Sequence, residues 1–95
     1  EFHPAVIRLI KNTIEAGKNH NIDVSVCGEL AGSIEGAILL VGMGVRTLSV
    51  SSRKINKVKE VLSRFSLQEI ENIALETLKH PDAETVLSTI QAFIK

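Results

Sequence analysis

Val24-Ser25-Val26-Cys27-Gly28-Glu29-Leu30-Ala31-Gly32, residues 24–32, is the most informative segment of this chain. It opens with apolar and polar residues in alternation, which is typical of a β-strand, and then breaks into a glycine-bounded loop. Cys27, the only cysteine in the chain, stands at that break. In α/β proteins, side chains at the carboxyl end of a parallel strand face the ligand crevice. We therefore expect this segment to carry both the sheet and the chemistry.

Helices and short strands are expected to alternate around this segment. Pro4 is well placed to begin a helix, and apolar residues then recur at spacings of three and four. Ser33 can cap a second helix, whose residues 37–41 are all apolar. This order is typical of consecutive βα units of a parallel sheet. The expected elements are a helix from Pro4 to Gly17, a strand over 22–27, a helix closed by Gly42 and Gly44, a strand over 45–50, and a helix over 55–65 capped by Ser51 or Ser52.

Two further helices are expected at the end of the chain. Ser66 and Glu69 form a capping-box sequence before one of them, and Asp82 can cap the other. Two parallel strands cannot bury themselves, because both edges of such a ribbon stay open. The pattern therefore implies missing strands or a partner, and we expect self-association through the apolar strand faces, which comprise Ile22, Val24, Val26, Leu48 and Val50.

Composition narrows the classes of function. The chain has 95 residues, 44% of them apolar, and its formal net charge is zero, so no bulk charge attracts nucleic acid or an anionic membrane. Three Phe without Trp or Tyr provide no set of platforms for stacking bases. The longest apolar run is far too short to span a bilayer. A single cysteine cannot form an internal disulfide, so we expect a cytoplasmic protein.

Four segments together resemble a known family. The block over 26–32, the Gly-Met-Gly ending of 39–44 and the segment 48–51 are similar to the end of Enzyme I of the bacterial phosphoenolpyruvate phosphotransferase system. The opening 4–10 resembles the helix that precedes this motif in the family. Ser33 stands where an aspartate is expected, and both residues can cap a helix. The similarity extends over essentially the whole chain.

The resemblance implies an α/β fold that is the carboxyl-terminal part of a phosphoenolpyruvate-binding (β/α)₈ TIM barrel. Residues 1–65 would supply the last two βα units and 66–95 a helical tail, so the separate piece would be rich in helix. A whole barrel takes about 250 residues. The barrel domain of this family is dimeric. Its Mg²⁺ ligands, its phosphate-binding arginines and its phosphohistidine would lie outside this chain, so we expect the chain alone to be inactive.

The resemblance also assigns the reaction and its residues. The phosphoryl group of phosphoenolpyruvate passes through an enzyme histidine to the phosphocarrier HPr, and pyruvate is released. Cys27 matches the general acid that protonates C3 of the enolate, with Gly28 and Glu29 beside it as candidate substrate-binding residues. An unperturbed thiol, with a pKa of about 8.5, holds its proton at neutral pH. A rigid strand end would keep it over one face of the enolate.

Other interpretations remain for each feature. Without the family, Cys27 reads as a small buried apolar residue, and Gly42-Met43-Gly44 reads as a helix stop. The basic group of Lys54, Lys57, Lys59 and Arg64 is expected to be a solvated helix face. The alternative function is a non-catalytic interaction or oligomerisation module derived from the barrel, whose apolar faces bind a partner or a second copy.

Overall fold

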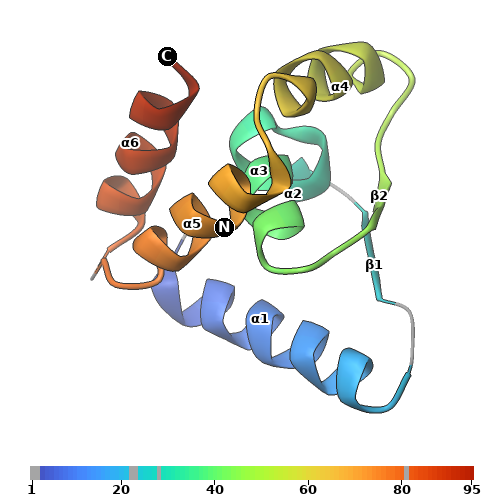
Figure 1. Ribbon diagram of the computed structural model, residues 1–95, viewed down its shortest axis with the longest axis vertical. Coiled ribbons are helices and arrows are strands. Elements are labelled where there is room, and N and C mark those ends of the chain that lie inside the picture. Colours follow the sequence, from blue (N-terminus) through green and yellow to red (C-terminus); the bar gives the residue numbers. More distant parts are fainter. Residues whose placement is uncertain (1–2, 22–23, 28, 81) are drawn as a thin grey trace.

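The computed structural model describes residues 3–21, 24–27, 29–80 and 82–95. Within them, the predicted order of helices and strands is found with one additional short helix, α2, and two more helices follow (Figure 1). No helix in these ranges is both long and apolar enough to cross a bilayer. The elements are α1 (Pro4–Asn19), β1 (Ser25–Cys27), α2 (Glu29–Gly32), α3 (Ile34–Gly42), β2 (Thr47–Ser49), α4 (Ile55–Ser63), α5 (Leu67–Thr77) and α6 (Ala83–Ile94).

The described strands form a two-stranded parallel sheet. Ser25 pairs with Thr47, and Cys27 at the end of β1 pairs with Ser49 at the end of β2. Both strands are shorter than predicted, and residues 22–23 of the expected first strand lie outside the described residues. The helix-rich α/β class is confirmed. Two strands alone do not define a barrel.

The end of α3 explains why β2 begins late. Gly44 has a φ of +111°, which favours glycine, and its N–H donates to the Val41 carbonyl over 3.0 Å. The Val45 N–H donates to the Leu40 carbonyl over 3.1 Å. These two hydrogen bonds form a Schellman motif. The interpretation of Gly42-Met43-Gly44 as a helix stop is therefore confirmed, and Val45 belongs to that stop instead of the sheet.

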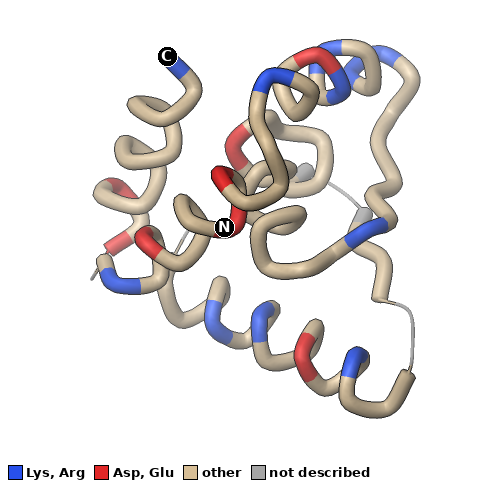
Figure 2. The backbone as a smooth tube through the Cα atoms, in the orientation of Figure 1, with Lys and Arg blue, Asp and Glu red and all other residues tan. Residues whose placement is uncertain are grey.

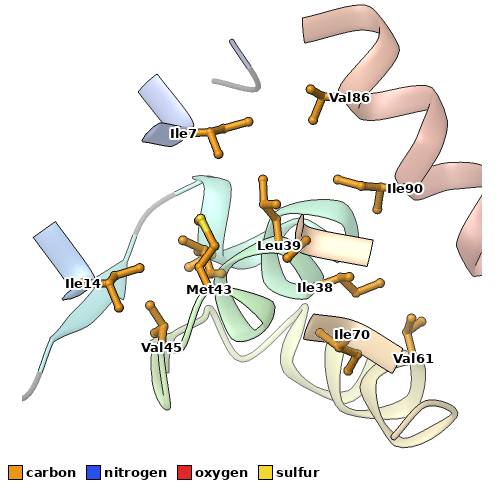
Figure 3. Close-up of a cluster of buried hydrophobic side chains, with 13 residues drawn as sticks. Ile7, Ile14, Ile38, Leu39, Met43, Val45, Val61, Ile70, Val86 and Ile90 are labelled. Atoms are coloured by element: carbon orange, nitrogen blue, oxygen red, sulfur yellow. The ribbon is translucent and has the colours of Figure 1, made fainter. Parts of the chain in front are cut away.

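The core surrounds α3, which is buried on nearly all sides. Its residues from Ala37 to Leu40 have almost no exposed surface. All the other helices pack apolar side chains around it, and α2 contributes the fully buried Ala31; Figure 3 shows part of this cluster. Gly42 lets α5 come close, since a Cβ added there would lie 2.6 Å from the Ala74 Cβ. The buried side chains around α3 include Ile7, Ile14, Val45, Val61, Ile70, Ala74, Val86 and Ile90.

The helix caps agree with the sequence in three of four predicted places, Ser33 of α3 among them. The Ser66 hydroxyl accepts from the Glu69 N–H, and the Glu69 carboxylate accepts from the Ser66 N–H, which completes the capping box. Asp82 caps α6. The side-chain cap predicted for α4 at Ser51 or Ser52 is wrong. There, the Ser51 carbonyl accepts from the Lys54 and Ile55 N–H groups, and a turn leads into the helix.

The two strands are only partly covered. Val24, Val26, Leu48 and Val50 are half-buried, whereas the intervening Ser25, Thr47 and Ser49 are exposed. A groove of about 270 Å³ separates α1 from β1 and is lined by Leu9, Ile10, Thr13, Ile14, Val24, Ser25 and Val26. A second groove, of about 300 Å³, lies beside β2 and is lined by Val41, Val45, Arg46, Leu48, Val50, Ile55, Val58, Lys59 and Leu62.

Candidate functional site

The carboxyl edge of the sheet is the candidate functional site. β1 ends at Cys27, directly before α2, and β2 ends at Ser49, directly before the loop to α4. The parallel register therefore brings the predicted catalytic position to the edge where parallel α/β sheets bind ligands. Gly28 and the side chains of Cys27 and Glu29 lie outside the described residues, so their roles stay predictions.

The corner between α2 and α3 is held together by hydrogen bonds and close packing within residues 30–36. The Ser33 hydroxyl accepts a hydrogen bond from the Gly36 N–H over 3.0 Å and donates one to the Leu30 carbonyl over 3.1 Å. Gly36 packs directly against the Leu30 carbonyl, where a Cβ would clash with it. The predicted N-cap at Ser33 is confirmed. The prediction of a glycine-bounded loop after β1 is wrong for residues 29–32, because they form the short helix α2.

A divalent metal ion needs several oxygen or nitrogen ligands close together. Among the described residues, no group of three His, Cys, Asp or Glu side chains comes together to hold a metal ion. The part of the site described here therefore does not provide a Mg²⁺ site. The expectation from the family resemblance, that Mg²⁺ ligands lie outside this chain, stays a prediction.

Some of the basic residues near α4 also line a groove, which the sequence does not predict. Lys54, Lys57, Lys59 and Arg64 are exposed, as expected of a solvated face. However, Lys54 and Lys57 also line a groove with Arg53, which faces the start of α3. Figure 2 shows the positive residues gathered along α4 and the turn before it. No sequence signal finds this groove, because its two walls are about 20 residues apart in the chain.

Comparison with known proteins defines the class. A family model described as "PEP-utilising enzyme, PEP-binding domain" matches residues 1–67. This chain belongs to that family.

Particular relatives are similar over nearly the whole chain. Phosphoenolpyruvate-protein phosphotransferase of Borreliella burgdorferi is 39% identical over 94 residues, which are 99% of this chain and 16% of that protein. The phosphoenolpyruvate-dependent phosphotransferase system protein of Escherichia coli is 33% identical over 94 residues, 13% of its length. Multiphosphoryl transfer protein of Xanthomonas campestris is 42% identical over 85 residues, 90% of this chain and 10% of that protein. The chain thus spans a sixth or less of these relatives.

Proposed function

We propose that this chain forms the last two βα units and the helical tail of a phosphoenolpyruvate-protein phosphotransferase. The complete enzyme, called the parent enzyme below, would move the phosphoryl group of phosphoenolpyruvate to the phosphocarrier HPr. The observation that carries this proposal is the position of Cys27. It ends a parallel strand, at the ligand-binding edge, inside the segment that matches the family.

Cys27 is proposed to be the general acid. When the bond between phosphorus and the enol oxygen breaks, the phosphoryl group goes to a histidine of the parent enzyme that lies outside this chain. The remaining enolate of pyruvate takes a proton at C3 from the Cys27 thiol. The resulting thiolate recovers its proton from water before the next turnover. Mg²⁺, held elsewhere in the parent enzyme, would neutralise phosphate charge.

The local structure supports such a role. A proton donor must be held within hydrogen-bonding reach of the carbon it protonates. The backbone of Cys27 is paired with β2, and the hydrogen bonds of Ser33 and the close packing of Gly36 hold residues 30–36 together. An ordered strand end followed by a hydrogen-bonded corner favours a positioned proton donor more than a free loop would.

The test is the Cys27→Ala variant of the parent enzyme. Phosphorylation of HPr driven by phosphoenolpyruvate should slow by about 10²- to 10⁴-fold, the usual contribution of a general acid. Transfer from phosphorylated HPr back to the enzyme histidine involves no enolate and should be unchanged, which provides an internal control. Normal turnover of the variant with phosphoenolpyruvate would refute the role of Cys27.

The open sides of the sheet support a second part of the proposal. In the parent enzyme, the grooves beside β1 and β2 would contact neighbouring barrel elements. In the separate chain, a second copy would cover these grooves, because removing half-buried Val26 and Leu48 from water lowers the free energy. The chain would then be a homo-oligomer.

A further inference from the structure

A positively charged groove lies between the start of α3 and the segment leading into α4. It has a volume of about 390 Å³. Residues 32–35 form one wall, and Arg53, Lys54, Lys57 and Val58 form the other. The first wall follows β1 through α2, and the second follows β2, so the groove opens at the carboxyl edge of the sheet.

The charges of the groove are unbalanced. Arg53, Lys54 and Lys57 contribute three cations, and Glu35 contributes one carboxylate. Among the described side chains, the ion pairs are Lys11–Glu15, Arg46–Glu71 and Arg64–Glu60, none of which involves a groove residue. Arg53, Lys54 and Lys57 therefore line the groove without an ion-pair partner among the described side chains. Such an arrangement attracts anions.

Gly32 lets Lys54 lie across the groove wall. A Cβ added at Gly32 would be 3.3 Å from the Lys54 Cδ and 3.8 Å from its Nζ. The lysine stem thus covers a position that has no side chain, and its amino group stays beside the buried Gly32 backbone. This packing gives one of the three cations a defined place.

The opposite wall offers hydrogen-bond donors. α3 begins at Ile34, so the N–H groups of Ile34 and Glu35 have no partner within the helix. The Ser33 hydroxyl is already used, since it caps the Gly36 N–H and donates to Leu30. Buried Val58 and half-buried Ile34 make part of the lining apolar, and such a lining strengthens nearby charge interactions.

We propose that this groove binds a small multivalent oxyanion, either a phosphate compound or a polycarboxylate, as a second ligand site at the carboxyl edge of the sheet. Arg53, Lys54 and Lys57 would hold its charge, and the first turn of α3 would donate to its oxygens. The site uses none of residues 27–29. It therefore stands independently of the general-acid role proposed for Cys27.

The test is an NMR titration of the 95-residue chain with inorganic phosphate and, separately, with citrate, at constant ionic strength. Saturable amide shifts are expected at residues 32–35 and 53–58, with a Kd of about 1–10 mM for a small exposed anion. Saturation by phosphate alone assigns the site to phosphate compounds. Saturation by citrate alone assigns it to polycarboxylates.

Matched variants separate a site from general charge attraction. Lys57→Gln should weaken binding by about three- to tenfold. Lys59→Gln removes the same charge from the same helix, but Lys59 lines the groove beside β2, so binding should be unchanged. Glu35→Gln should tighten binding, because Glu35 is the only carboxylate among the described lining residues. Circular dichroism of each variant verifies that it is folded.

The proposal is wrong if neither anion saturates, or if Lys57→Gln and Lys59→Gln weaken binding equally. Its failure is distinct from failure of the general-acid proposal. The chain carrying Cys27→Ala should titrate like the unaltered chain, and a parent enzyme that turns over normally without Cys27 would leave this groove unaffected.

Discussion

Gly42 sets the distance between α3 and α5. A Cβ at this position would lie 2.6 Å from the Ala74 Cβ and 2.7 Å from the Ile70 carbonyl oxygen. Real side chains do not come so close, and a backbone oxygen cannot move without moving its helix. The contact between these helices therefore depends on the absence of one methyl group.

Gly42→Ala should lower the free energy of unfolding by about 1–3 kcal/mol, the usual cost of overpacking a core. Urea denaturation of the 95-residue chain measures it. In a double-mutant cycle, Ala74→Gly should cost less in the Gly42→Ala background than in the unaltered chain, because it removes the nearer of the two clashing atoms. Additive effects of the two substitutions would show that the Ala74 Cβ is not the atom that the new methyl group displaces.

At the residue scale, the sequence predicts helix caps better than it predicts which residues from distant segments lie side by side. Ser33, Ser66 and Asp82 were predicted as caps, and each is one. A cap depends on hydrogen bonds within three residues, so local sequence contains the whole signal. The cations Arg53 and Lys57 could not be placed in a groove, because its other wall comes from a different βα unit.

Elements depend on partners as well as on their own residues. Alternation predicted both strands, but β1 and β2 each keep only three residues. The Val45 N–H, predicted to belong to the strand, closes α3 instead. α2 has only four residues, too few to show a helical period, so its sequence predicts a loop.

The start of α6 has a titratable cap. The Thr85 N–H donates to the Asp82 carboxylate over 2.8 Å. This backbone hydrogen bond, then one with the Thr85 side chain, and to a smaller extent the charge of His80 lower the pKa of Asp82 below its ordinary value. The charged carboxylate is therefore the form that the folded chain favours.

Stability should depend on pH through this cap. Because the pKa of Asp82 is lower in the folded chain, its contribution is fully present above the unfolded pKa of about 3.9 and is lost as the pH falls through the folded value. Asp82→Asn keeps an oxygen acceptor but does not titrate. Denaturation between about pH 2 and pH 6 should show a smaller acid loss for this variant. If stability fell equally with pH in the variant and in the unaltered chain, the effect of Asp82 would be contradicted, because the two chains have all other carboxylates in common.

At the scale of the whole molecule, the two strands found in the described residues are fewer than a closed sheet needs. Val26 and Leu48 stay half-buried, and the grooves on either side are lined mainly by apolar residues. The order of elements and the parallel direction followed from the sequence. The (β/α)₈ barrel rests on the family resemblance, because two strands contain no information about closure.

Self-association of the separate chain should depend on the groove beside β1. Sizing with light scattering should show a mass that rises with concentration. Leu9 lines this groove and is 67% exposed, so Leu9→Glu should preserve the fold and shift the chain toward monomer. Leu75, which is 56% exposed on α5 and outside both grooves, provides the matched control in Leu75→Glu. A monomer at every concentration would exclude the proposed oligomer.

The central position of α3 also affects how the chain emerges from the ribosome. Translation completes α3 before α5 and α6, yet both of these later helices pack on it. The apolar residues Ala37 to Leu40 are thus synthesised well before most of the surface that shields them from water. During that interval the nascent polypeptide exposes an apolar segment of the kind that chaperones bind. The last helices made are therefore the ones that end this exposure.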